Sequence, residues 1–239
     1  MNASLYVSLA GMVDTLGISA PTLVDAVRGR VTIERCDERL RRWATALLDR
    51  AKVSRSVRHG ERAAGSETFI VMSNHRSLYD VPLLMESFPR TLRMVAKTEL
   101  FRVPIWGAAM REAGFIEIDR KRGERAREQL GVAKTRLSQG INVWFAPEGT
   151  RSRTGQLGSF KSGGFRLALD TGVRILPVAI RGTEQILPAD ALLTRRGASV
   201  ELEYGEPVDP RAYGPERRAD LMARVRAAIA GMLGAPTTE

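Results

Sequence analysis

Apolar runs and amphipathic stretches alternate along the chain from about residue 53 onward. Six runs rich in β-branched and aromatic residues predict strands, at 68–72, 91–96, 115–118, 141–146, 173–180 and 199–204. Stretches with helical character lie between several of them or follow the last, at 77–87, 123–138, 161–171 and 215–233. Strands that alternate with helices are typical of an α/β fold, so we expect a mixed, largely parallel sheet flanked by helices.

The first 52 residues contain helical patterns and no strand-like run. One face of a first helix gathers the apolar side chains of Leu5, Leu9, Met12, Val13 and Leu16. Pro21 can open a second short helix that Gly29 ends. The uncharged opening, residues 1–13, is shorter than the roughly 20 residues that a membrane-spanning helix needs. No other segment comes closer, so we expect no span.

Residues 37–52 form a third helical pattern, and it is strongly amphipathic. Its apolar positions recur at helical spacing and are Leu40, Trp43, Ala44, Leu47, Leu48 and Ala51. The opposite face carries Arg39, Arg41, Arg42, Asp49 and Arg50. The helix can pack on the core, or it can lie in a membrane interface with Trp43 at headgroup depth. We divide the chain into an N-terminal helical segment at 1–52, which we expect to be membrane-interfacial, and a second domain at 53–239.

Composition narrows the classes of protein that the chain can belong to. It has 239 residues, 44% of them hydrophobic, which suits one globular domain with a small appendage. The net charge of +10 attracts polyanions, such as nucleic acid, anionic lipid headgroups or phosphorylated small molecules. Cys36 is the only cysteine, which excludes an intramolecular disulfide and a multi-cysteine zinc site, and we interpret it as structural.

The first candidate for chemistry follows the strand at 68–72. The stretch "VMSNHRSLYD" contains His75, one of only two histidines, and then Asp80. An acid at this position suits a capping box at a helix that begins near Ser77, and His75 suits an ordinary turn. The same helix start can bring the Asp80 carboxylate to the imidazole, which leaves the other ring nitrogen free to take a proton. The residues alone leave both interpretations open.

Two further stretches carry positive charge after strands. The glycine-rich segment "FAPEGTRSRTGQLGSFKSGG" (145–164) can bring backbone N–H groups close to an anion, and Arg151 and Lys161 can add charge-assisted bonds to phosphate. It lacks the spacing of a P-loop. The stretch "GFIEIDRKRGER" (114–125) ends its strand in three basic residues at 120–122. Each stretch can also be an ordinary basic surface segment.

Together these segments resemble the glycerol-phosphate and lysophospholipid acyltransferase family, whose best-known members are the 1-acyl-glycerol-3-phosphate acyltransferases. Four blocks stand in the family's order: "NHRSLYD", which matches Asn-His-x4-Asp, then "GFIEIDR", then "APEGTRS" with "FKSGG", and finally "ILPVAI". The resemblance covers roughly residues 53–208. One departure is Ala146, where the family usually has an aromatic or aliphatic residue before Pro-Glu-Gly.

The resemblance implies a role for each matching residue. His75 is the general base on the acceptor hydroxyl, and Asp80 orients and polarises it. The site for the acceptor's phosphate is formed by Arg120, Glu148, Gly149, Thr150 and Arg151, with Lys161 as a further contributor. We expect Glu148 to hold the neighbouring arginines in place, since its own charge repels the anion. Pro177 shapes the acyl-donor side. Family members take acyl-CoA or acyl-carrier protein as co-substrate and need no cofactor or metal.

The resemblance therefore predicts an O-acyltransferase that converts 1-acyl-glycerol-3-phosphate to phosphatidic acid as a peripheral protein on the cytoplasmic face of the membrane. Another lysolipid, including a lyso-ornithine lipid, is an alternative acceptor. A non-catalytic lipid-binding protein is a second class, and the presence of His75, Asp80, Glu148 and Arg151 argues against it. A nucleic-acid binder is a third, but no recognition helix or aromatic RNA motif supports it.

Overall fold

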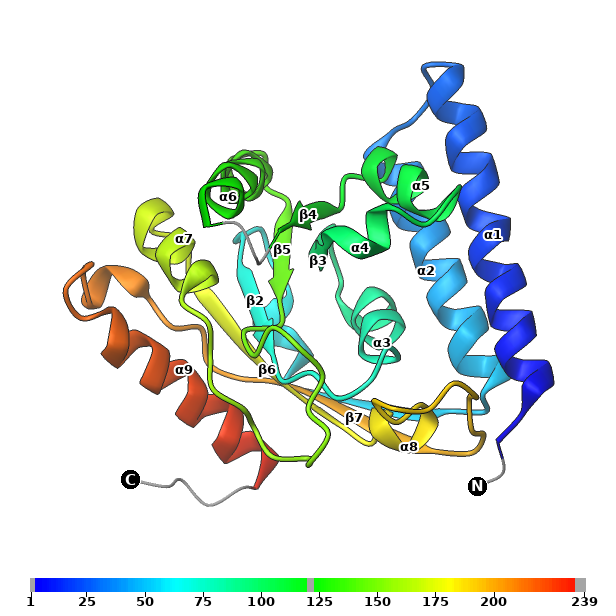
Figure 1. Ribbon diagram of the computed structural model, residues 1–239. Helices are drawn as coiled ribbons and strands as arrows, with labels where there is room; N and C mark the ends of the chain where they lie inside the picture. Colours follow the sequence, from blue (N-terminus) through cyan, green and yellow to red (C-terminus); the bar gives the residue numbers. More distant parts are fainter. Residues whose placement is uncertain (1–2, 120–122, 235–239) are drawn as a thin grey trace.

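A computed structural model describes residues 3–119 and 123–234 of the chain (Figure 1). The strands are β1 (Ser54–Arg58), β2 (Ile70–Ser73), β3 (Leu92–Lys97), β4 (Ile116–Ile118), β5 (Asn142–Phe145), β6 (Ile175–Arg181) and β7 (Ser199–Tyr204). The α-helices are α1 (Leu5–Val27), α2 (Ile33–Arg50), α3 (Asp80–Ser87), α4 (Thr98–Phe101), α5 (Trp106–Glu112), α6 (Gly123–Ser138), α7 (Gly163–Thr171), α8 (Thr183–Ile186) and α9 (Arg218–Leu233). Two 3₁₀ turns lie at Gly60–Ala63 and Pro210–Ala212.

The strands form one seven-stranded sheet in the order β1-β7-β6-β2-β5-β3-β4. Every neighbouring pair is parallel except β6 and β7, which run antiparallel. This confirms the expected α/β fold with a mixed, largely parallel sheet. Strand β1 was not expected from the sequence, because Ser54–Arg58 is polar and mostly exposed. Its pairing with β7, in which Ser54 lies opposite Ser199, is what makes it a strand.

Helices cover both faces of the sheet, and alternate side chains of each inner strand point to opposite faces. On one face Phe69 and Val71 of the β2 region pack with α2 and α3. On the other face Ile70 and Met72 pack with α6, α7 and α9. Because β2, β5 and β6 are buried on both faces, they read as continuous apolar runs in the sequence.

The first helix is longer than the sequence suggested, since α1 runs from Leu5 to Val27 with Pro21 inside it. We expected Pro21 to start a separate helix, and this was wrong. A proline in a helix leaves the carbonyl four residues earlier without its partner, and here that residue, Gly17, is exposed to solvent. Packing against α2 keeps the two halves of α1 in one line. One contact between the helices is the 3.0 Å hydrogen bond that the Trp43 indole donates to Thr15 Oγ1.

This continuity changes the expectation about membrane spans. By length and composition, α1 is apolar enough to cross a membrane, and it is the one such helix among the described residues. From the sequence we counted only the uncharged opening, residues 1–13, and therefore expected no span. The helix still carries Asp14 and Asp25, which form ion pairs of 2.6 Å with Arg50 and Arg39 of α2.

Helix α2 packs on the core. Its apolar stripe of Leu40, Ala44 and Leu48 is buried with α3 and the sheet. Trp43 is half-buried and bonded to α1, and the arginines at positions 39 and 50 point toward α1 and its two acids. Of the two interpretations left open for residues 37–52, the structure shows the core helix, and the exposed apolar face belongs to α1.

Candidate active site

The candidate site lies beyond the carboxyl ends of three neighbouring strands. His75 follows β2, Glu148 follows β5, and Thr183 follows β6. Since β5, β2 and β6 are adjacent in the sheet, parallel pairing brings the three loops together at one edge. Lys97 ends β3 on the other side of β5. Arg120, which follows β4, lies outside the described residues.

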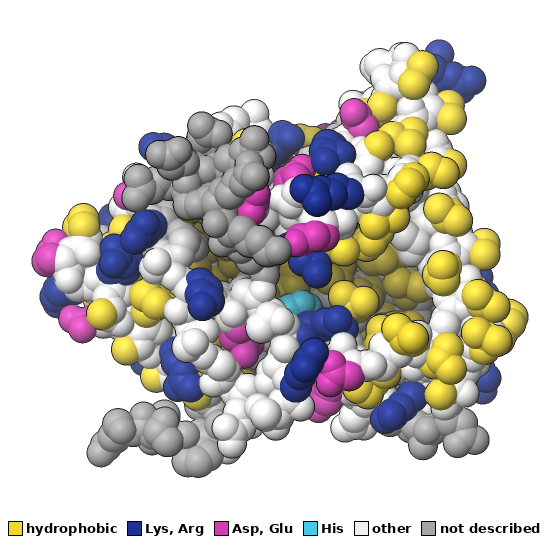
Figure 2. All heavy atoms as spheres, in the orientation of Figure 1, with side chains coloured by type: hydrophobic (Ala, Val, Ile, Leu, Met, Phe, Trp, Pro, Cys, Tyr) yellow, Lys and Arg dark blue, Asp and Glu magenta, His cyan; other side chains and the backbone are white. Residues whose placement is uncertain are grey.

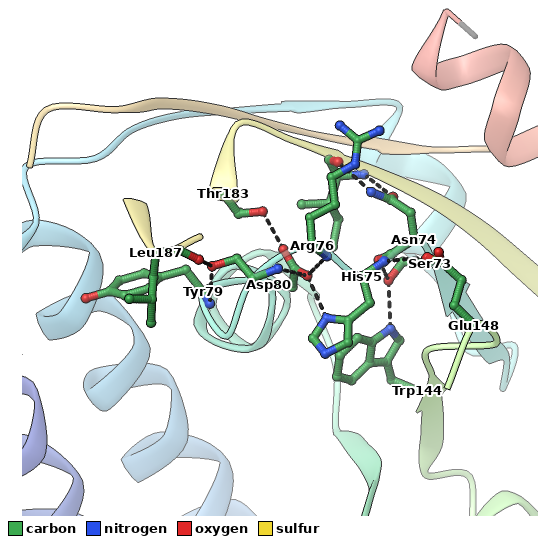
Figure 3. Close-up of polar contacts among 12 residues, drawn as sticks. Ser73, Asn74, His75, Arg76, Tyr79, Asp80, Trp144, Glu148, Thr183 and Leu187 are labelled. Carbon is green, nitrogen blue, oxygen red and sulfur yellow. Dashed lines mark hydrogen bonds and ion pairs between the residues drawn. The ribbon is translucent and has the colours of Figure 1, made fainter. Parts of the chain in front are cut away.

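His75 and Asp80 are in direct contact. The Nδ1 atom of His75 lies 2.7 Å from Oδ2 of Asp80 (Figure 3). The same oxygen accepts the backbone N–H groups of Arg76 and Ser77 at 2.8 and 3.0 Å. An acceptor so engaged is a carboxylate, so Nδ1 carries the proton and donates it to this bond. The other ring nitrogen, Nε2, keeps its lone pair for an incoming proton.

The surroundings of the pair are mostly closed to solvent. The Asp80 side chain is fully buried, whereas the His75 side chain is 16% exposed. The Thr183 hydroxyl donates to Asp80 Oδ1, so both carboxylate oxygens have partners. A buried carboxylate needs such donors because water cannot solvate it.

The two interpretations of Asp80 prove compatible. Helix α3 begins at Asp80 itself, later than the expected start near Ser77. The carboxylate nevertheless reaches back to the Ser77 N–H, as the acid of a capping box does. The Ser77 hydroxyl accepts from Tyr79 N–H and donates to the Leu187 carbonyl. One side chain therefore fixes the helix start and contacts the imidazole.

Two buried side chains hold the loop that carries His75. The Asn74 amide makes two 2.8 Å hydrogen bonds to the backbone of Ile180 in β6, one through each of its polar atoms. Below the imidazole, Trp144 of β5 presents its ring edge-on at 5.8 Å between centroids. The indole N–H donates to Ser73 Oγ at 2.9 Å. These contacts link the histidine to both strands that flank β2 (Figure 3).

Glu148 has a different role from the one we expected. Its carboxylate accepts the backbone N–H of His75 at 2.9 Å and the backbone N–H of Gly158 at 2.8 Å. Among the described residues no ion pair joins it to an arginine, so it does not hold Arg151 in place as we expected, and Arg120 lies outside these residues. The Ser152 N–H donates to the His75 carbonyl at 2.8 Å. Glu148 therefore ties the glycine-rich segment to the histidine loop.

Burial raises the pKa of Glu148, and the two backbone N–H groups oppose that effect. The packing is close, because a Cβ at Gly158 would lie 3.0 Å from the Glu148 Oε2 atom. A glycine at position 158 lets its backbone approach the carboxylate.

The cationic groups that we selected in the glycine-rich segment are Arg151 and Lys161. Gly149 turns the chain with φ +75°, a conformation that favours glycine, and Arg151 follows it half-buried. Thr150 and Lys161 are exposed. Among the described residues, no carboxylate forms an ion pair with Arg151 or Lys161. Arg76, which the sequence analysis did not select, bridges from the histidine loop to the Gly155 carbonyl.

Pro177 lies away from these groups, buried in the interior strand β6 opposite Met72. Its carbonyl accepts the Gly205 N–H at 2.8 Å, just before the regular pairing of β6 with β7 begins at Val178. The missing N–H of the proline thus faces an irregular segment, which explains why a proline is tolerated in this strand. A role on the acyl-donor side stays a prediction.

Four structural contributors were not selected from the sequence. Thr183 was detectable, because it follows a predicted strand as His75 does. Asn74 and Arg76 flank His75 inside the quoted motif. Trp144 lies within a buried apolar strand, and nothing in the sequence pattern distinguished it from a core residue. Among the described residues, no group of three or more His, Cys, Asp or Glu side chains is arranged to hold a metal ion.

A family model described as Acyltransferase matches residues 54–181, more than half of the chain. The chain belongs to this acyltransferase family.

 The matched range includes His75, Asp80, Glu148, Arg151 and Pro177, and Thr183 follows two residues after its end.

Individual relatives agree with this assignment. The chain is 38% identical over 119 residues to the "1-acyl-sn-glycerol-3-phosphate acyltransferase LPAT1, chloroplastic" of Arabidopsis thaliana, which covers 50% of this chain and 33% of that protein. It is 39% identical over 125 residues to the "1-acyl-sn-glycerol-3-phosphate acyltransferase alpha" of Homo sapiens, with 52% and 44% covered. The matches thus span less than half the length of these two curated relatives.

A solved structure matches nearly the whole chain. The crystal structure of the 1-acyl-sn-glycerophosphate (LPA) acyltransferase PlsC from Thermotoga maritima superposes with a TM-score of 0.79 and 27% sequence identity. The superposition covers 98% of each chain. The N-terminal helices and the sheet are therefore parts of one shared architecture.

Proposed function

We propose that the protein is an O-acyltransferase that converts 1-acyl-glycerol-3-phosphate to phosphatidic acid, with acyl-CoA or acyl-carrier protein as the donor. The observation that carries this proposal is the 2.7 Å contact between His75 Nδ1 and Asp80 Oδ2, which leaves Nε2 as a base. The family assignment and the names of the relatives supply the reaction class and the acceptor.

In the proposed reaction, His75 Nε2 takes the proton of the acceptor hydroxyl as its oxygen attacks the thioester carbonyl. The tetrahedral intermediate then collapses, the C–S bond breaks, and the thiolate takes the proton back from the imidazolium. Asp80 stabilises the imidazolium and fixes the ring orientation through Nδ1. No covalent bond to the enzyme forms, so the positioning of acceptor and donor is what the protein contributes besides the base.

The acceptor's phosphate is proposed to bind at the start of the glycine-rich segment, next to the histidine loop. Arg151 and Lys161 have no carboxylate partner among the described residues, and a phosphate monoester offers several oxygens to such cations. Gly149 and Thr150 form the turn before Arg151. Arg120 remains a proposed contributor from the sequence. Glu148 supports this site through backbone contacts rather than by contacting the lipid.

We further propose that the protein attaches to the cytoplasmic face of the membrane as a peripheral protein through α1. One side of α1 is lined by exposed apolar residues, namely Leu5, Tyr6, Leu9, Met12, Val13, Leu16, Val24 and Val27. Figure 2 shows apolar side chains gathered along the side of the molecule where α1 lies in Figure 1. The turn before α5, a helix that packs against α1, adds Val103 and Ile105. Such a surface suits a lipid interface.

An in-plane orientation fits α1 better than a transmembrane one. Its Asp14 and Asp25 are paired with arginines of α2, and α2 is part of the core. A helix held along the catalytic domain in this way cannot leave it without breaking both ion pairs. Lying flat, α1 offers about 35 Å of apolar surface at about 1.5 Å per residue.

The proposal is tested by measuring thioester consumption with the purified protein and a panel of lysolipids. We expect thiol release with 1-acyl-glycerol-3-phosphate and its loss in the His75→Ala variant. Turnover only with a lyso-ornithine lipid would leave the acyltransferase class intact and change the acceptor. Vesicle binding without thioester consumption would favour a non-catalytic lipid-binding protein. Salt-dependent nucleic-acid binding without consumption would point to the third class.

A further inference from the structure

An exposed leucine stands at the tip of the loop between α8 and β7. The Leu192 side chain is 92% exposed, and its neighbour Leu193 is 37% exposed. A single exposed leucine on a protein surface needs no explanation by itself. The attachment of this loop and the charges beside it are what give it significance.

The base of the loop is fixed rather than loosely attached. Thr194 is buried, its carbonyl accepts the Ser4 N–H at 2.8 Å, and its own N–H donates to Ser8 Oγ at 2.8 Å. The Arg195 N–H donates to the Ile186 carbonyl at 2.7 Å. Leu192 is therefore presented from a base that is hydrogen-bonded to the first turn of α1 (Figure 1).

This attachment places the base of the loop beside the amino end of the apolar side of α1. The first turn of α1 exposes Leu5 and Tyr6 next to Ser4 and Ser8, which hold the loop. An exposed apolar side chain is thus added at the amino end of a surface that already runs along the helix.

Positive charge flanks the tip without compensation. Among the described residues, neither Arg195 nor Arg196 forms an ion pair with a carboxylate. The acid of this loop, Asp190, is paired instead with Arg153 of the glycine-rich segment at 3.1 Å. An apolar tip beside free arginines matches the two layers of an anionic lipid surface, since the leucine can enter the acyl boundary and the arginines can contact headgroups.

We propose that the loop 187–198 is a second lipid-contacting element, in which Leu192 inserts into the membrane and Arg195 and Arg196 bind anionic headgroups. The inference rests on the membrane attachment proposed above and adds a contact outside α1. A contact beside one end of α1 restricts how the protein rotates about that helix. The base of the loop also touches the histidine loop, because Ser77 Oγ donates to the Leu187 carbonyl at 2.8 Å. Docking of the loop would therefore set the orientation of the candidate active site toward the lipid.

The test compares vesicle co-sedimentation of the full chain with that of Leu192→Asp. The matched control is Val132→Asp, since Val132 is a 47% exposed apolar residue on α6, away from α1 (Figure 1). We expect Leu192→Asp to weaken binding about tenfold or more, whereas the control changes it little. An Arg195→Gln/Arg196→Gln variant should lose about fivefold per charge on vesicles that contain phosphatidylglycerol, and little on pure phosphatidylcholine.

A labelling experiment keeps the inference testable if a charged variant folds poorly. Cys36 is buried, so a thiol-reactive, environment-sensitive fluorophore should label Leu192→Cys selectively. We expect its emission to shift to the blue on anionic vesicles. Unchanged emission, together with Leu192→Asp binding as strongly as Val132→Asp, would overturn the inference alone. Failure of the unaltered protein to bind either kind of vesicle would overturn the membrane attachment as well.

Discussion

Thr183 and Asp80 are 103 positions apart in the chain, and the Thr183 hydroxyl donates a hydrogen bond to Asp80 Oδ1 inside the core. Neither side chain is accessible to solvent. This bond completes the partners of the carboxylate, whose other oxygen contacts His75, Arg76 and Ser77. Thr183 thereby acts on the imidazole through Asp80 and is a positioning residue.

Replacing Thr183 by valine should therefore lower activity without removing any group that touches the substrate. Valine keeps the shape and leaves Asp80 Oδ1 buried without a donor, an effect of about 1–3 kcal/mol. We expect kcat to fall roughly tenfold and the acidic limb of the kcat/KM profile to move to higher pH. A carboxylate with one donor fewer holds the imidazolium proton more strongly. Thr183→Ser should restore both readouts, and equal behaviour of the serine and valine variants would contradict the role.

Loss of the base itself should have a larger effect on rate and a smaller one on folding. We expect His75→Ala to reduce kcat by roughly 10²–10⁴-fold, the usual range for a general base, at a nearly unchanged Tm. A folded variant that keeps more than about a tenth of the turnover would exclude His75 as the base.

Asp80→Asn should differ by losing stability as well as activity. An amide has one acceptor oxygen, whereas the Asp80 carboxylate accepts from His75, Arg76, Ser77 and Thr183. The NH₂ group of the asparagine would face other hydrogen-bond donors at a fully buried position, which destabilises the folded state. Thermal unfolding of Asp80→Asn and His75→Ala checks this. An Asp80→Asn variant with an unchanged Tm would contradict the stabilising role of the hydrogen bonds to Asp80.

Glu148 should make the free energy of unfolding depend on pH, and the Glu148→Gln variant should lack this dependence. Burial raises its folded pKa above the ordinary value of 4.5, so the folded state binds more protons between those two values. Its contribution to stability is present below pH 4.5 and is lost as pH rises through the raised pKa. The unfolding free energy of the unaltered protein, minus that of Glu148→Gln, should therefore fall over this window. Denaturant unfolding at several pH values measures the difference, and a flat or rising one would contradict the assignment.

Arg151 should select the acceptor through its phosphate. Each charge-assisted hydrogen bond contributes about 1.5–3 kcal/mol, so Arg151→Ala should lower kcat/KM for lysophosphatidic acid by roughly 10–150-fold. Lysophosphatidylcholine, whose phosphate is a diester, should be affected less. The Arg166→Ala variant is a suitable control, because Arg166 is an exposed arginine on α7. Equal loss with both acceptors would remove Arg151 from the phosphate site.

Much of the framework could be predicted from local sequence patterns. The runs at 68–72, 141–146 and 173–180 are buried on both faces, so their composition alone marks them as strands. The histidine loop and the glycine-rich segment each follow such a strand, and parallel pairing brings strand ends to one edge. The contact between His75 and Asp80 could also be predicted from local sequence, since the two residues are close in the chain and one helix start connects them.

What only the tertiary structure decided depends on partners that are distant in sequence. β1 exists because β7 lies beside it, and α1 continues through Pro21 because α2 supports it. The exposed apolar side of α1 could be separated from the buried stripe of α2 only by their packing. Glu148 was expected beside arginines, yet burial favours the nearest donors, and these are the backbone N–H groups of His75 and Gly158. Periodicity and motifs report what a residue's neighbours in the chain require, whereas the partner of a buried polar group is set by whichever donor folding places within reach.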